Sequence, residues 1–122
     1  MSKRALVSIV DDNESVRESL PDLLQRFGFD AQAFSSAEEF LRSEAAARTI
    51  CLILDVGLPG MSGPDLHQEL IRRGQGIPTI FITAGDPSLR RRLVASGAVA
   101  CLFKPFSDNA LLDALNVALG MR

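Results

Sequence analysis

The 122-residue sequence has little cysteine, no tryptophan or tyrosine and no excess of positive charge. Its two cysteines, Cys51 and Cys101, each fall inside an apolar run and lack the spacing of metal ligands or a redox pair. A formal net charge of −2 gives no overall attraction to nucleic acid or to anionic membranes. No apolar run approaches the roughly 20 residues that span a bilayer. These absences exclude a cysteine-based site, a membrane-spanning segment and a basic nucleic-acid-binding surface.

Signs of repeats, linkers and nucleotide-binding loops are also missing. Without them, residues 1–122 are expected to form one domain, with no second domain in this sequence. The sequence opens with Met1-Ser2-Lys3-Arg4 and passes directly into an apolar segment, from which we expect a cytoplasmic protein. Neither a G-x-G-x-x-G pattern nor a phosphate-binding loop is present, which argues against nucleotide binding.

Apolar strand patterns and helical patterns alternate five times along the chain. Strands are expected at residues 5–10, 30–34, 50–54, 78–83 and 99–103. Helices are expected to begin near Asn13, Ser36, Pro64, Asp86-Pro87 and Ser107. This alternation with short connections predicts a parallel sheet with helices on both faces. Residues 30–34 alternate in polarity where the other strands are nearly continuous apolar runs, so this strand is expected at a sheet edge.

Polar residues stand where the expected strands end. The apolar run at 50–54 leads into Asp55 and then into a turn rich in glycine and proline. A single aspartate at such a place is more often a turn cap, but the other strand ends carry suitable partners: Asp11, Asp12, Thr83 and Lys104. In an open parallel sheet, ligands bind at the carboxyl ends of the strands. We therefore expect these side chains to form one site.

The ordered set of motifs resembles the receiver domains of two-component response regulators, most closely those of the FixJ type. The matching residues are Asp11-Asp12, Asp55 with Leu58-Pro59-Gly60-Met61-Ser62-Gly63, Thr83-Ala84 and Lys104-Pro105-Phe106. The resemblance covers essentially all of residues 1–122. It implies a flavodoxin-like, doubly wound, five-stranded parallel sheet of order 2-1-3-4-5 with five helices.

The resemblance also assigns roles to the strand-end residues. Asp55 would be the phosphoacceptor. Mg²⁺, or Mn²⁺ in its place, would be bound by Asp12, Asp55 and the Gly57 backbone carbonyl, and by Asp11 directly or through water. The phosphoryl group would be bound by Thr83, Ala84 and Lys104. Clustered carboxylates suit a hard divalent cation, and a lysine, a hydroxyl and a backbone N–H suit a phosphoryl group.

The partners implied by the resemblance are proteins. A sensor histidine kinase or phosphotransfer protein would donate the phosphoryl group, and an output domain or target protein would read the changed surface. A phosphorylation-dependent dimer is a further expectation. The only catalysis expected is the domain's own phosphorylation and dephosphorylation. An aspartate-nucleophile phosphatase would need a second acid two residues after Asp55, where Gly57 stands instead.

One position departs from the receiver pattern and supports an alternative function. Receivers usually have tyrosine or phenylalanine three residues before the site lysine, as part of the switch that also includes Thr83, and here that residue is Cys101. We expect Phe103 to face the opposite side of the strand. The alternative is therefore a receiver-like interaction module that works without phosphorylation. The resemblance further implies a cis peptide bond between Lys104 and Pro105.

Two other groups of polar residues are expected to be ordinary surface. His67, the only histidine, lies among polar neighbours on a helix and is expected to be exposed. Arg90, Arg91 and Arg92 are expected to form a solvated face, with a partner-docking patch as the alternative.

Overall fold

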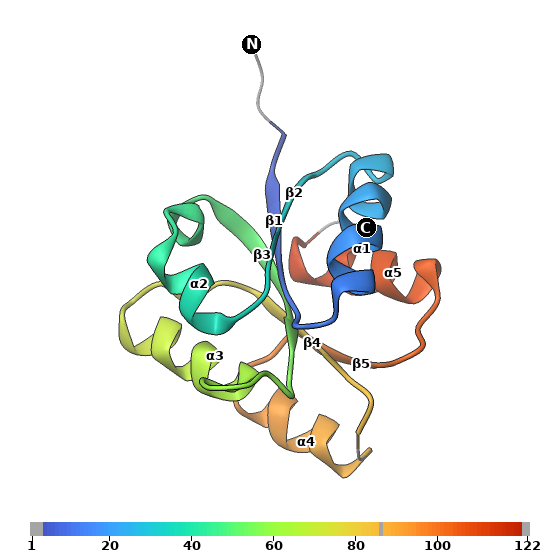
Figure 1. The fold of residues 1–122 in the computed structure, drawn as a ribbon. Coiled ribbons are helices and arrows are strands. Elements are labelled where there is room, and N and C mark those ends of the chain that lie inside the picture. Colours follow the sequence, from blue (N-terminus) through green and yellow to red (C-terminus); the bar gives the residue numbers. More distant parts are fainter. Residues whose placement is uncertain (1–3, 86, 121–122) are drawn as a thin grey trace.

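The computed structural model describes residues 4–85 and 87–120, which contain one five-stranded sheet. Its strands lie in the order β2-β1-β3-β4-β5, and each neighbouring pair is parallel (Figure 1). The strands are β1 (Leu6–Val10), β2 (Asp30–Phe34), β3 (Thr49–Asp55), β4 (Thr79–Thr83) and β5 (Ala100–Phe103). The predicted flavodoxin-like sheet is confirmed, with small differences in strand bounds.

Within this part of the chain, five α-helices cover the two faces of the sheet. They are α1 (Glu14–Arg26), α2 (Ala37–Arg42), α3 (Gly63–Arg72), α4 (Ser88–Ala95) and α5 (Asp108–Ala118). Buried residues of α1 and α5 pack on one face, and those of α2, α3 and α4 pack on the other (Figure 1). None of the described helices is long and apolar enough to cross a membrane.

Side-chain caps define where most of these helices begin. Asn13, Ser36, Ser62 and Ser107 each accept a hydrogen bond from a backbone N–H in the first turn of α1, α2, α3 and α5. Helix α4 begins after Pro87 without such a bond, and the expected cap residue Asp86 lies outside the described residues. A short 3₁₀ helix, Ala45–Ala47, precedes β3 and was not predicted.

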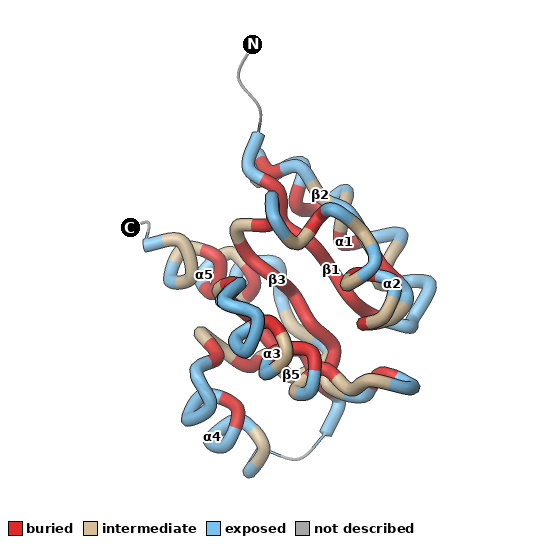
Figure 2. Tube along the Cα trace, turned by 90° about the vertical axis from the view of Figure 1, so that its left-hand side faces the viewer, coloured by how far each residue is buried: buried red, intermediate tan, exposed pale blue. Residues whose placement is uncertain are grey.

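The central strands are buried on both faces. Every residue of β1 and β4 is buried, and β3 is buried except at Ile50. Figure 2 shows the continuous burial along β1 and most of β3. Strand β2 instead alternates between exposed and partly covered residues and ends on the buried Phe34. Its place at one edge of the sheet confirms the prediction made from its alternating polarity.

The register of the sheet brings the ends of four strands together. Val10 pairs with Leu54, Asp55 with Ile82, and Thr83 with Phe103. The residues at or just after these ends therefore share the carboxyl edge of the sheet, as the sequence predicted.

Candidate functional site

Three carboxylates meet at the carboxyl edge of β1 and β3. One oxygen atom from each of Asp11, Asp12 and Asp55 can be chosen so that all three lie within 4.8 Å of one another. Asp11 and Asp55 are buried, and Asp12 is exposed. Carboxylate oxygens open to water on one side are the donors that Mg²⁺ prefers, so the residues present fit this ion.

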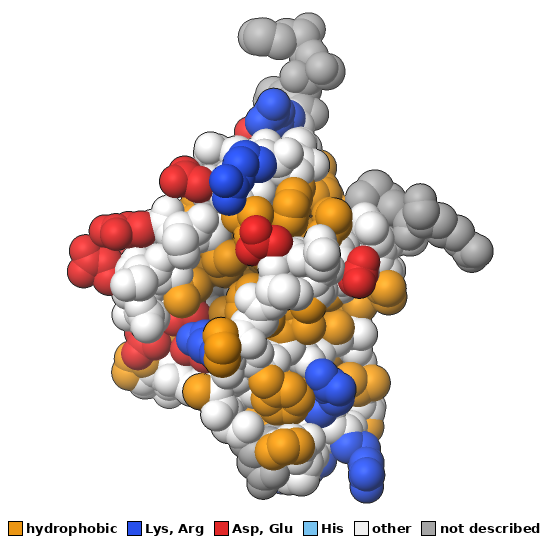
Figure 3. Space-filling model, turned by 90° about the vertical axis from the view of Figure 1, so that its right-hand side faces the viewer, with side chains coloured by type: hydrophobic (Ala, Val, Ile, Leu, Met, Phe, Trp, Pro, Cys, Tyr) orange, Lys and Arg blue, Asp and Glu red, His pale blue; other side chains and the backbone are white. Residues whose placement is uncertain are grey.

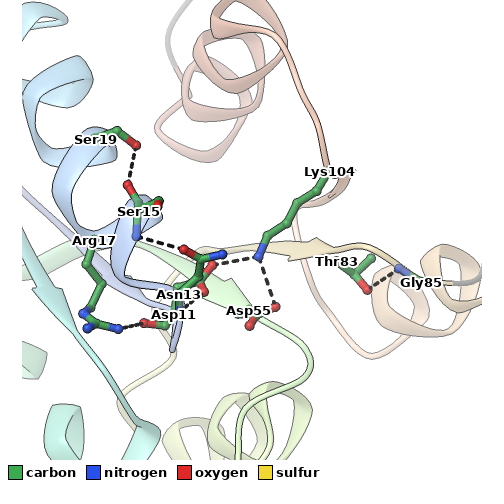
Figure 4. A network of polar contacts seen from close by, with 9 residues as sticks. All are labelled: Asp11, Asn13, Ser15, Arg17, Ser19, Asp55, Thr83, Gly85 and Lys104. Carbon is green, nitrogen blue, oxygen red and sulfur yellow. Dashed lines mark hydrogen bonds and ion pairs between the residues drawn. The ribbon is translucent and has the colours of Figure 1, made fainter.

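Lys104 supplies a positive charge to this cluster and lies closer to Asp11 than to Asp55. Its Nζ atom lies 3.0 Å from Asp11 Oδ2 and 3.9 Å from Asp55 Oδ1 (Figure 4). Asp11 also accepts a hydrogen bond from the Asn13 backbone N–H, at 2.9 Å. The buried Asp11 carboxylate is thus well satisfied, and Asp55 is the less paired of the two.

The environment of Asp55 disfavours its ionised form. Burial raises the pKa of Asp55, and the neighbouring charges of Asp11 and Asp12 raise it further. Lys104 and the Gly57 backbone N–H act in the opposite direction but do not cancel the rise in pKa. A bound divalent cation would relieve this repulsion.

Thr83 lies at the same edge and has a defined hydroxyl contact. Its Oγ1 atom accepts a hydrogen bond from the Gly85 backbone N–H at 3.0 Å (Figure 4). Ala84, between them, is exposed. The turn after β4 therefore presents a hydroxyl and backbone groups at the edge where Lys104 and Asp55 lie.

The loop after Asp55 returns close to the strand that it leaves. A side chain at position 63 would overlap the Asp55 carbonyl oxygen, so only glycine allows α3 to begin there. The Gly63 N–H donates to the Val56 carbonyl, and Leu58 is buried in the core. These contacts place the exposed Gly57 beside Asp55.

The structure brings all the predicted strand-end residues to one edge, but two predictions about β5 need comment. The Lys104–Pro105 peptide bond is cis, as the resemblance implied. Phe103, however, packs with the same core cluster as Cys101, so the prediction that it faces the opposite side was wrong. Residues two positions apart on a strand share a face.

The expected exposure of His67 was also wrong, whereas the expected exposure of the three arginines is confirmed. His67 is 4% exposed and packs edge-to-face on Phe81, with ring centroids 5.4 Å apart. Arg90, Arg91 and Arg92 are all exposed as expected. Arg90 also donates hydrogen bonds to the Cys101 carbonyl and lies over the Phe103 ring, 5.0 Å from its centroid.

Sequence reasoning did not assign three residues that support the site. The Asn13 backbone N–H donates a hydrogen bond to the Asp11 carboxylate. The Arg17 guanidinium donates one to the Asp11 backbone carbonyl. The helix-capping position of Asn13 was a usable signal for the first of these. Glu38 contacts the loop after Asp55 across 23 positions of sequence, which no local pattern reveals.

A doubly wound parallel sheet with a carboxylate cluster and a lysine at its carboxyl edge defines an α/β protein in which three carboxylates could hold a divalent cation. The family model described as "Response regulator receiver domain" matches residues 7–116. The chain belongs to this family, the receiver domains of two-component systems.

The chain is similar to several curated proteins. It is 47% identical to nodulation protein W of Bradyrhizobium diazoefficiens over 118 residues, which are 96% of this chain and 52% of that protein. It is 37% identical to the transcriptional regulatory protein FixJ of Azorhizobium caulinodans, over 93% of this chain and 54% of that protein. The chain thus spans about half the length of the curated relatives it matches.

Solved structures agree with this assignment. A structure titled "FIXJ-N" superimposes with a TM-score of 0.83 at 36% identity, covering 98% of this chain and 96% of that chain. The response regulator StyR superimposes with a TM-score of 0.87 at 42% identity, covering 96% of this chain and 60% of that chain.

Proposed function

We propose that this chain takes a phosphoryl group onto Asp55 from a partner histidine kinase or phosphotransfer protein in the presence of Mg²⁺, and that this changes a protein-interaction surface. The observation that carries the proposal is the cluster of Asp11, Asp12 and Asp55 with Lys104 bridging Asp11 and Asp55. The family supports it, because two-component receivers are its members.

The proposed reaction is a single displacement at phosphorus. A carboxylate oxygen of Asp55 forms the new O–P bond, and the bond from phosphorus to the donor nitrogen or oxygen breaks, its electron pair leaving with the donor. The metal ion would be held by Asp12, Asp55 and the Gly57 carbonyl, and by Asp11 directly or through water. When bound, it supplies charge neutralisation for the phosphoryl oxygens.

Three groups of this chain would bind the transferred phosphoryl group. Lys104 is within 3.9 Å of Asp55 and supplies a positive charge. Thr83 supplies a hydroxyl, which accepts a hydrogen bond from Gly85 and can still donate its O–H proton, and Ala84 supplies a backbone N–H. We propose no reaction beyond the domain's own phosphorylation and dephosphorylation.

The side of the molecule that carries α1 and α5 offers a route for the donor protein. Hydrophobic side chains are prominent on this face (Figure 3). A groove of about 430 Å³ between α1 and the segment after β5 is lined by Val16, Leu20, Phe106 and Lys104, among others. Since the groove includes the site lysine, a protein that delivers a phosphoryl group to Asp55 from this side would contact its apolar wall.

The output is proposed from the relatives alone. Proteins named as transcriptional regulators, TdiR of Thauera aromatica and FixJ of Azorhizobium caulinodans, are about twice the length that this chain covers. We propose that residues 1–122 act as a receiver in the cytoplasm for an output domain or a separate target protein. A dimer formed on phosphorylation is a further part of the proposal, and direct binding of nucleic acid or membrane is not.

A second candidate function is binding to a partner without phosphorylation. The observation that favours it is Cys101, a small buried side chain where receivers usually have an aromatic ring. Such a module would keep the fold and the surface but would not depend on the chemistry of Asp55.

The two functions are separated by phosphorylating the protein directly. We expect acetyl phosphate with Mg²⁺ to add one phosphoryl mass to the wild-type protein and none to Asp55→Ala, measured on the intact protein. Omitting Mg²⁺ is the control and should abolish the gain in mass. An unmodified wild-type protein would favour the second function, and label retained in Asp55→Ala would place the acceptor elsewhere.

A further inference from the structure

Glu38 lies in the first turn of α2, yet its side chain reaches the loop between β3 and α3. Its Oε2 atom accepts a hydrogen bond from the Met61 backbone N–H at 2.9 Å. This hydrogen bond is the main reason that the pKa of Glu38 lies below its usual range. Glu38 is therefore ionised at neutral pH, and its bond to Met61 is charge-assisted, a stronger kind than one between neutral groups.

Gly60, next to Met61, leaves room for this carboxylate because it has no side chain. Its φ of +72° lies in the left-handed region that glycine adopts without strain. A Cβ atom at position 60 would also lie only 2.7 Å from Glu38 Oε2. The Glu38 carboxylate thus lies where a Cβ atom at position 60 would stand, so the loop backbone and Glu38 are in close contact.

The loop that Glu38 holds begins at the proposed phosphorylation site. Val56 donates its N–H to the Ile82 carbonyl at 3.0 Å, which fixes the start of the loop to β4. Gly57 follows, and its backbone N–H acts on the Asp55 carboxylate. Glu38 fixes the other end at Met61, so the exposed Gly57 lies between two anchored points.

Helix α2 is itself fixed relative to the acidic cluster. Phe40 is fully buried and packs edge-to-face on Phe34, with ring centroids 5.3 Å apart. The Phe34 carbonyl accepts a hydrogen bond from the Asp11 backbone N–H at 3.0 Å. A closed path of contacts therefore runs from Asp11 through Phe34 and α2 to Glu38, and through the loop back to Asp55.

We infer that Glu38 is a positioning residue, which holds the β3–α3 loop so that the Gly57 carbonyl is in place for the divalent cation. The inference rests on the proposed function, because it assigns a task to the loop of that same site. Groups that orient metal ligands typically change metal affinity by about 10–100-fold when they are removed. Because Glu38 orients one ligand through the loop, we expect an effect near the lower end.

The test compares Glu38→Ala and Glu38→Gln with the neighbouring variant Glu39→Ala. Glu39 also accepts a backbone N–H, that of Ser35 at 2.7 Å, but this contact stays within the start of α2. It therefore controls for a general weakening of the helix. Two quantities are measured: the apparent Mg²⁺ dissociation constant by calorimetry, and amide hydrogen exchange of residues 57–62 in metal-free protein.

We expect Glu38→Ala to raise the Mg²⁺ dissociation constant about tenfold and to speed exchange in residues 57–62. Glu38→Gln keeps an acceptor oxygen without the charge and should lie between Glu38→Ala and the wild type. Glu39→Ala should match the wild type in both measurements. At saturating Mg²⁺, all three variants should still be phosphorylated by acetyl phosphate, which a misfolded site would prevent.

Two results would overturn the inference while leaving the proposed function intact. The first is a Glu38→Ala variant with a wild-type Mg²⁺ dissociation constant. The second is an equal weakening of Mg²⁺ binding by Glu39→Ala, which would assign the effect to α2 as a whole. A wild-type protein that neither binds Mg²⁺ nor is phosphorylated would contradict the proposed function itself, and this inference with it.

Discussion

Asp55 carries a negative charge at a place that disfavours it when no cation is bound. It is 7% exposed, and Asp11 and Asp12 lie beside it. The nearby lysine is closer to Asp11 than to Asp55. The pKa of Asp55 in the folded protein is therefore above the ordinary value of 3.8. The folded state then binds this proton more tightly than the unfolded chain does, so ionised Asp55 reduces stability at neutral pH.

Asp55→Asn should remove this loss of stability in metal-free protein. At pH 7 with a chelator present, we expect the variant to melt about 3–6 °C higher, as a gain on the order of 1 kcal/mol would give in a domain of this size. The difference should shrink as the pH falls through the raised pKa toward 3.8, because wild-type Asp55 then becomes protonated. Melting curves at several pH values check this, and a difference independent of pH would contradict it.

Single residues also show where sequence reasoning succeeded and failed. Asp55, Thr83 and Lys104 could be predicted because each follows an apolar strand, and strand ends meet at one edge. The burial of His67 could not be predicted, because its polar neighbours on α3 gave no sign that its ring packs on Phe81 of β4. The error at Phe103 was avoidable, since strand periodicity alone places it on the same face as Cys101.

At the level of elements, α4 and β5 are joined by Arg90. Its guanidinium donates to the Cys101 carbonyl at 3.0 Å and lies over the Phe103 ring. Strand β5 is an edge strand, so this carbonyl would otherwise face solvent or a partner. Arg90 and Phe103 thus connect α4 to β5 next to the proposed site. Cys101 itself contributes only a small buried side chain.

This arrangement predicts where phosphorylation acts. A phosphoryl group can shift a conformational equilibrium only through contacts that differ between the two states. Thr83 can form such a contact, and Cys101 has no ring to move with it. We therefore expect a phosphoryl mimic such as beryllofluoride to change amide exchange mainly at Ala84, Gly85 and the start of α4, and less in β5.

Cys101→Tyr is the matched variant for this prediction. With a ring restored, the change in exchange on adding the mimic should extend into β5, and Asp55→Ala with the same mimic is the negative control. Changes centred on β5 in the wild-type protein, with the Gly85 turn silent, would contradict the prediction.

Elements with strong local signals were predicted and weak ones were not. The caps Asn13, Ser36 and Ser107 mark helix starts in the sequence, and the structure has helices there. The Ala45–Ala47 helix was missed, because a run of three alanines carries no cap and no apolar period. Its buried Ala45 instead accepts, through its carbonyl, a hydrogen bond from the Thr49 hydroxyl at 2.7 Å, a contact visible only in three dimensions.

For the whole molecule, the alternation of strands and helices predicted a parallel sheet but not the order of its strands. The order came from the resemblance to receivers, with one independent sign in the alternating residues 30–34 of an edge strand. The order places β1 next to β3, and this adjacency brings Asp11 and Asp12 to Asp55. The tether from Glu38 to Met61 depends on the packing of α2 beside this sheet, so it could not be predicted from local patterns.

Because the acidic cluster exists only in the folded protein, Mg²⁺ should stabilise the whole domain. A ligand at ten times its dissociation constant stabilises the native state by about 1.4 kcal/mol, which corresponds to a rise in Tm of about 4–8 °C here.

Asp12→Asn removes one carboxylate and should weaken this response to Mg²⁺. Without metal, the variant should melt slightly higher than the wild type because repulsion between the carboxylates is reduced. Thermal melts with and without millimolar Mg²⁺ measure both effects, with Asp113→Asn, an exposed aspartate on α5, as the control. A wild-type Tm that Mg²⁺ leaves unchanged would show that the three carboxylates do not bind the ion, and an equal response from Asp12→Asn would show that Asp12 is not one of its ligands.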